Sequence, residues 1–213
     1  MDAADFVLSI WQDYDLTART VEHLGMFAVA LAAAIVIGVA VGVLLFRYEQ
    51  LSGPGFAALN VLETVPDLAL LVLLIPLVGI GAVPTVVACI LYSVLPIARN
   101  THAGLTGVGP DEIGVAEALG LTEREVLLHV RIPLSLPLVA GGIRIAVVFA
   151  MGVVTLGGLI GAGGLGVPLQ TGIFNNIPEL ILVSGLWVGV LAVLSDGIAG
   201  CVERRLERRY GRW

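Results

Sequence analysis

Four charged side chains lie inside long apolar stretches of the sequence. They are Glu63, Asp67, Arg144 and Asp196. A charge in such surroundings is costly, so it usually pairs with an opposite charge or lines the route of a polar solute. We therefore expect Arg144 to form an ion pair with one of the three carboxylates. We favour a structural role, in which the pair holds two helices together. The alternative is that the pair lines the route of a polar solute.

A second stretch with chemical potential is GAGGLG at residues 161–166, which matches G-x-G-x-x-G. That pattern binds a dinucleotide only when a strand precedes it and a helix follows. Here it comes after an apolar run and leads to Pro168. We expect its glycines to permit close helix packing and a flexible outer gate instead. They are Gly161, Gly163, Gly164 and Gly166.

No residues have the spacing of a catalytic or metal site. His23, His102 and His129 are scattered, and two cysteines cannot hold a metal ion by themselves. All eleven basic residues are arginine, whereas a P-loop needs a lysine to reach the β- and γ-phosphates of ATP. The sequence thus predicts a chain without catalytic residues, cofactor or metal. If ATP drives it, another chain must bind the nucleotide.

The composition is that of an all-α, multi-pass membrane protein. Of 213 residues, 58% are hydrophobic and 13% charged, against about 25% charged in soluble domains. Residues 68–98 carry no charge and would form a helix of roughly 46 Å, too long for a hydrocarbon core of about 30 Å. The glycines near 80 divide that run. Five spans follow, at residues 24–46, 56–78, 84–100, 138–160 and 179–200, with a turn at residues 52–55 after the first.

The arginines predict the orientation. Arg99, Arg124, Arg131 and the arginines of the tail at 201–213 all fall on one side of the predicted spans. Basic residues near span ends favour the cytoplasm. The sequence therefore predicts an extracytoplasmic N-terminal segment at residues 1–19, a cytoplasmic insert at 109–133 and a basic cytoplasmic tail.

The insert at residues 109–133 has the pattern of two short helices joined by a glycine. Pro110 suits the first position of a helix, and Gly120 suits its C-terminal end. Thr122 and Glu125 have the spacing of a capping box for a second helix, which Pro133 is expected to end. Such a helix pair either docks a separate protein or lies on the membrane surface without a partner, and the pattern alone does not choose.

The insert resembles the cytoplasmic signature of binding-protein-dependent ABC import permeases of type I, with a MetI-like fold. The family pattern is E-A-A, three residues, Gly, nine residues, then I-x-L-P. Gly120 and the tetrad at 130–133 match, whereas Gly114 stands where the acid belongs and Glu117 lies one turn further on. The resemblance implies a coupling helix that docks on an ATPase subunit. The residues implied are Gly114, Ala116, Glu117, Gly120, Leu121, Val130, Ile132 and Pro133.

Three further segments narrow the resemblance to the osmoprotectant branch, which imports glycine betaine, choline and carnitine. They are ETVPDLALL (63–71), LYSVLPIARNTHAG (91–104) and GLIGAGGLG (158–166). The resemblance covers residues 20–200 and implies an inner-membrane permease in membrane lipid. Its implied partners are an ABC ATPase, a substrate-binding protein and a second permease copy or homologue, with no nucleic acid. The alternatives are methionine or another amino acid as cargo, or a channel or scaffold without ATP coupling.

Overall fold

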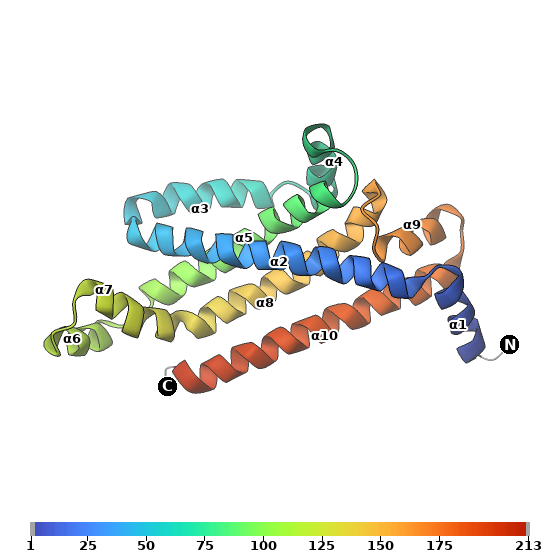
Figure 1. Cartoon of the computed structure of the whole chain (residues 1–213). Helices are drawn as coiled ribbons and strands as arrows, with labels where there is room; N and C mark the ends of the chain where they lie inside the picture. The colour runs from blue at the N-terminus through green and yellow to red at the C-terminus, as the bar shows by residue number, and fades with distance from the viewer. Residues whose placement is uncertain (1–2, 212–213) are drawn as a thin grey trace.

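The computed structural model describes residues 3–211, and no β-strand occurs among them. Figure 1 shows a long bundle with short helices at both ends. Its helices are α1 (Ala3–Asp13), α2 (Leu16–Arg47), α3 (Glu49–Glu63), α4 (Asp67–Val78), α5 (Ala82–Thr106), α6 (Pro110–Ala118), α7 (Glu123–Val126), α8 (Ile132–Gly157), α9 (Gly166–Phe174) and α10 (Pro178–Tyr210). A π-helical turn, η1 (Leu127–Arg131), joins α7 to α8, and a 3₁₀ turn, η2 (Gly158–Ile160), follows α8.

Among residues 3–211, four helical segments are long and apolar enough to cross a membrane. They are Leu16–Arg47, Ala82–Thr106, Glu123–Ile160 and Pro178–Tyr210. They correspond to the predicted spans at 24–46, 84–100, 138–160 and 179–200, although each helix extends beyond them. The N-terminal boundary at residue 19 falls inside α2, and the tail continues α10 as helix to Tyr210.

The predicted span at 56–78 is a broken pair rather than one helix. Helices α3 and α4 together are apolar enough to span, but they meet at an angle of 95°. Pro66, with φ −60° and ψ 139°, is extended, and a proline also disfavours helix at the residue before it. The Tyr92 hydroxyl donates to the carbonyl of Val65 at 2.5 Å and holds the bend against α5. Residues 3–211 therefore contain four candidate spans, and a fifth if the bent pair counts as one.

The predicted turn at residues 52–55 is wrong. The chain reverses at Tyr48, the single residue between α2 and α3, and α3 runs through Pro54. Gly55 serves packing instead: a Cβ there would lie 2.7 Å from Cδ2 of Leu45 on α2. By contrast, the glycine turn before α5 is confirmed, since Gly79 and Gly81 have φ of 86° and 113°.

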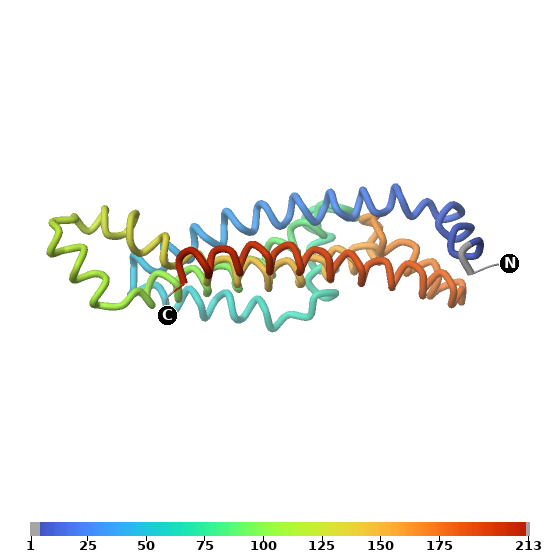
Figure 2. Tube along the Cα trace, turned by 90° about the horizontal axis from the view of Figure 1, so that it is seen from below, coloured from blue at the N-terminus to red at the C-terminus, as the bar shows by residue number. Residues whose placement is uncertain are grey.

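Helix α5 is the centre of the bundle. In its apolar window 61% of residues are buried, against 11% in α10. It packs against α2 on one side and α8 on the other, and α10 lies on α8; the tube in Figure 2 shows the same long axes side by side. Small residues permit the approach: a Cβ on Gly42 of α2 would lie 2.6 Å from Cβ of Thr101. Close backbone contact of this kind stabilises helices where solvent cannot drive association.

Candidate functional site

The insert forms a compact projection at one end of the bundle (Figure 1), which we call the knuckle, residues 109–126. Pro110 begins α6 with no side-chain cap, and Asp111 and Glu112 follow in its first turn, where the helix dipole favours acids. At the far end the N–H of Gly120 bonds to the carbonyl of Glu117 and that of Leu121 to Ala116. This is a Schellman motif, which needs the left-handed φ of +86° that Gly120 adopts.

The second helix of the knuckle begins with the predicted capping box. The Thr122 hydroxyl accepts from the Glu125 N–H at 3.4 Å, and the Glu125 carboxylate accepts from the Thr122 N–H at 2.9 Å. The expectation that Pro133 ends this helix is wrong. Ile132 donates its N–H to Leu127, five residues back. Proline has no N–H to continue the i−4 pattern, and the wider π turn before it lets the helix pass on into α8.

Arg131 fastens the base of the knuckle. Its Nη1 donates to the carbonyl of Leu105 at 2.8 Å, close to the end of α5. Its guanidinium carbon also lies 5.2 Å from the centre of the Phe46 ring, near the end of α2. One side chain thus joins η1 to the ends of two spans. The family pattern does not reveal this role, because Arg131 occupies the variable position of the I-x-L-P tetrad. A lone arginine between two apolar residues is the one local signal of it.

A groove of about 710 Å³ separates the knuckle from the end of α2. Glu117, Arg124 and Arg131 are among its lining residues. On the outer side, Val115 and Leu119 are 64% and 75% exposed. The knuckle therefore presents an apolar ridge outward and charged groups toward the groove.

The structure separates the residues predicted for coupling into two groups. Gly114, Glu117 and Gly120 are exposed and Ala116 is buried within the knuckle, whereas Val130, Ile132 and Pro133 are half-buried at its base; Leu121 is half-buried between them. A Cβ on Gly114 would meet nothing within 4 Å. An acid would therefore fit at position 114, so the glycine there is not required by packing.

Arg144 stands at the centre of a three-residue ionic cluster between α8 and α10. Its Nε and Nη2 donate to the two oxygens of Asp196 at 2.6 and 2.9 Å, and its Nη1 donates to Glu203 at 3.0 Å. Glu203 was missed because the sequence placed it in the tail; it lies two helical turns beyond Asp196, on the same face. Among the described residues Glu63 and Asp67 form no ion pair with Arg144; they flank the bend between α3 and α4.

The glycine loop at 161–165 lies against α2 at the other end of the bundle. Gly161, Gly163 and Gly164 have φ of 74°, 91° and 65°. The Gly164 N–H donates to Oε2 of Glu22 at 2.9 Å, and Arg19 pairs with the same oxygen at 3.0 Å. Gly166, which begins α9, packs closely against α8. A Cβ at this position would lie 2.0 Å from the carbonyl oxygen of Thr155, so a side chain does not fit there. No strand precedes the loop in the described chain, so its surroundings are not those of a dinucleotide site.

Within residues 3–211 no three His, Cys, Asp or Glu side chains gather closely enough to hold a metal ion. His23 is fully buried, with Nε2 3.1 Å from the sulfur of Met151. The knuckle and the glycine loop lie at opposite ends of one bundle (Figure 1).

Known proteins agree with this architecture. The model of a family described as "Binding-protein-dependent transport system inner membrane component" matches residues 34–208. The chain is 41% identical to the osmoprotectant import permease protein OsmW of Salmonella typhimurium, over 85% of this chain and 86% of that one. It is 36% identical to the glycine betaine/carnitine/choline permease protein OpuCB of Bacillus subtilis, over 90% and 88%.

A solved structure of the MetNI methionine ABC transporter in an inward-facing conformation has a similar fold. Its matching chain superposes with a TM-score of 0.82 at 25% identity, covering 92% of this chain and 97% of that one. Family model, relatives and fold therefore agree over most of the sequence. The chain belongs to the family of binding-protein-dependent transport system inner membrane components, as a multi-pass permease of the type I ABC importer fold.

Proposed function

We propose that this chain is the membrane-spanning permease subunit of an ATP-driven importer for osmoprotectants such as glycine betaine, choline or carnitine. The observation that carries the proposal is the identity of 41% and 36% to permeases named for these solutes, over 85% and 90% of the chain. The chain would form the translocation pathway, with a second permease copy or homologue completing it. A separate ATPase and a substrate-binding protein would supply energy and selectivity.

The knuckle is the proposed docking element for the ATPase. Its ridge, Val115 and Leu119, is largely exposed. Because the ridge lies beyond the spans, no lipid would cover these apolar side chains, and such an exposed apolar patch suits a protein partner. At the base of the knuckle, the Arg131 side chain contacts the ends of α2 and α5. A force on α6 would therefore reach the spans rather than fold the knuckle over.

The distribution of arginine supports an orientation with the knuckle in the cytoplasm. The C-terminal end of α10 and the knuckle lie at the same end of the bundle in Figure 1, and the N-terminus lies at the other. Arg99, Arg124 and Arg131 belong to that same end, as do the tail arginines. Positive residues favour the cytoplasmic side. The N-terminal segment and the glycine loop would then face outward, where the loop serves as an outer gate.

The ionic cluster of Arg144 has a proposed structural role. Helix α10 is poorly buried, and the cluster ties it to α8 through three hydrogen bonds. Inside the membrane such a tie is costly to break, because each partner would be left without a counter-charge. The cluster would keep α10 in register with α8 while the bundle moves.

Transport measurements test the proposed cargo. The complete transport system is expressed in a strain lacking its own osmoprotectant importers, and uptake of labelled glycine betaine, choline, carnitine and methionine is compared. We expect one or more of the three quaternary amines to accumulate and methionine not to compete. Methionine uptake would favour the amino-acid alternative suggested by the fold match. Uptake that persists without a co-purifying ATPase would favour a channel.

A further inference from the structure

Helix α10 carries one continuous exposed ridge that no described part of the chain covers. The ridge residues recur every three or four positions: Leu182, Leu186, Val190, Leu194, Ile198 and Cys201. The five aliphatic members are between 45% and 70% exposed. From Leu182 to Ile198 the ridge is roughly 24 Å long at 1.5 Å per residue, which nearly spans a hydrocarbon core of about 30 Å.

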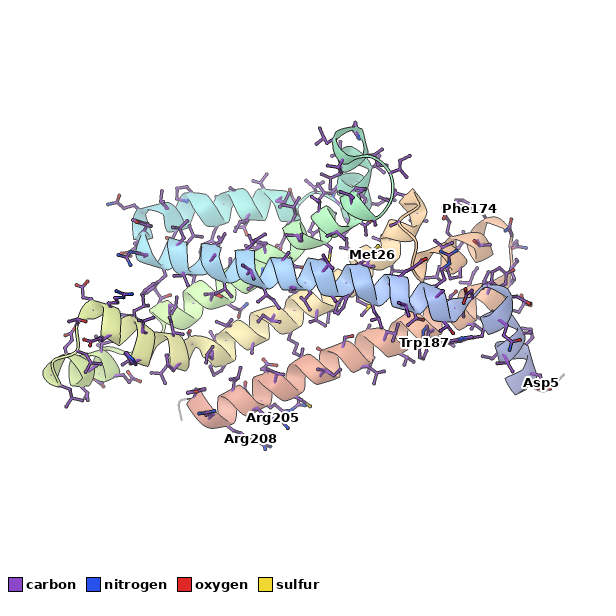
Figure 3. The ribbon with its side chains drawn as sticks, viewed as in Figure 1. Asp5, Met26, Phe174, Trp187, Arg205 and Arg208 are labelled. Atoms are coloured by element: carbon purple, nitrogen blue, oxygen red, sulfur yellow. The ribbon has the colours of Figure 1, made fainter. Side chains whose placement is uncertain are left out.

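The same ridge ends in arginine. Arg205 and Arg208 continue its spacing after Cys201, and in Figure 3 both side chains project from α10 away from the other helices. A depression of about 180 Å³ lies between Cys201, Arg204, Arg205 and Arg208. None of these arginines forms an ion pair within the described residues. Of the acids on this part of the helix, Glu203 is already bound to Arg144, which leaves Glu207 as the one acid among three arginines.

An apolar groove begins beside this basic depression. It has a volume of about 180 Å³, lies between α8 and α10, and is lined by aliphatic side chains including Val139, Ile143, Val202 and Leu206. Val202 and Leu206 lie three residues before and one residue after Arg205 on the helix. Arg205 therefore lies, along α10, between two residues that line this groove and beside the arginines of the basic depression.

We propose that the end of α10 is a binding site for an anionic phospholipid. The phosphate would lie between Arg204, Arg205 and Arg208, where guanidinium groups bind phosphate oxygens in pairs. One acyl chain would follow the ridge toward Ile198 and Leu194, and the other would enter the groove between α8 and α10. Arg205 lies roughly 10 Å beyond Ile198 along the helix, which is the level of the headgroups when the ridge lies in hydrocarbon.

A lipid fits this face better than a second copy of the chain. In a two-fold symmetric contact each copy presents the same patch. The arginines of the two copies would then face one another and repel, with only Glu207 of each copy to offset their charge. An anionic headgroup neutralises the same charges. The proposal requires only that the chain lie in a membrane, so it stands or falls independently of the proposed cargo.

The test uses the complete transporter, purified with its partner subunits into nanodiscs of equimolar phosphatidylcholine and phosphatidylglycerol. Spin-labelled lipids report the preference of the protein for phosphatidylglycerol, and native mass spectrometry counts the molecules retained. We expect R205Q/R208Q to lower that preference on the order of tenfold, R205K/R208K to lose less because it keeps the charges without the paired guanidinium bonds, and each single glutamine variant to lose part.

The control is Arg47→Gln, which removes one exposed arginine outside the knuckle from the same end of the molecule and is expected to leave the preference unchanged, whereas Arg205→Gln alone should lower it. Equal preference in wild type and R205Q/R208Q would overturn the proposal, as would an equal loss in the control. A disulfide between the exposed Cys201 of two copies, formed by mild oxidation in native membranes, would show that a second chain covers the ridge instead.

Discussion

Glu22 and Gly164 are 142 residues apart in the sequence, yet the carboxylate of one accepts the N–H of the other at 2.9 Å. Glu22 belongs to α2 and Gly164 to the glycine loop after α8. The contact therefore ties the first long helix to the loop that we propose as the outer gate. Any opening of that loop away from α2 must break this bond and the contact of Arg19 with the same carboxylate.

Replacing Gly164 with alanine should weaken this contact. The residue has φ of +65°, and a Cβ there would lie 3.2 Å from both Cα and Nδ1 of His23. Left-handed backbone costs a residue with a side chain about 1 kcal/mol or more. We expect a lower melting temperature and faster hydrogen exchange in the loop. Gly25→Ala is the control, because a Cβ there meets nothing within 4 Å; loss of stability in both variants alike would contradict the argument.

Removing the carboxylate of Glu22 tests the same contact from the other side. In Glu22→Ala the Gly164 N–H loses its acceptor, so exchange should rise at residues 161–165 and not in the knuckle. Glu49→Ala removes an exposed carboxylate from α3 and should leave both segments unchanged. Hydrogen exchange with mass spectrometry measures both segments in one experiment, and an unchanged loop in Glu22→Ala would count against a stabilising contact between Glu22 and Gly164.

The ionic cluster predicts an asymmetric response to charge reversal. Arg144→Asp should abolish uptake, because it places a third carboxylate beside Asp196 and Glu203. Exchanging the pair as R144D/D196R should restore part of the uptake. Adding Glu203→Gln should restore more, since it removes the remaining native acid beside the aspartate introduced on α8. Uptake and the amount of folded permease in the membrane are measured together. No gain in either rescue variant would refute the pairing role.

Gly120→Ala should damage coupling rather than insertion. Its φ of +86° is unfavourable for alanine, at a cost of about 1 kcal/mol to the Schellman motif. We expect normal amounts of permease in the membrane, less co-purifying ATPase and lower uptake. Gly114→Ala is the matched control, since its helical site has open space and alanine favours helix. Equal ATPase recovery in both variants would argue against the knuckle as the docking element.

Glu117 and Gly114 give a test of the missing acid. If Glu117 replaces it, Glu117→Gln should reduce uptake and Gly114→Glu should restore it in the double variant. The open space at Gly114 allows the glutamate to be introduced without a clash. Uptake that is unaffected by Glu117→Gln would show that Glu117 does not replace the missing acid and only lines the groove.

Sequence patterns predicted the features that depend on neighbouring residues. The capping box of Thr122 and Glu125 and the helix stop at Gly120 follow from local hydrogen bonds and one φ angle, so three or four residues define them. The bend at Pro66 was missed because the apolar run continues across it, and hydropathy does not distinguish a straight span from a broken one. Glu203 and Arg131 act through contacts with distant helices, which no local pattern contains.

The absence of a break at Pro133 has a mechanical consequence. From Glu123 to Ile160 the helix runs for 38 residues, roughly 57 Å at 1.5 Å per residue. One end of this rod belongs to the knuckle and the other adjoins the glycine loop, with Arg144 between them. A tilt at one end displaces the other in the opposite direction, as in a lever with its pivot in the bundle. A continuous helix of this length would carry a tilt of the knuckle to the glycine loop without a hinge between them.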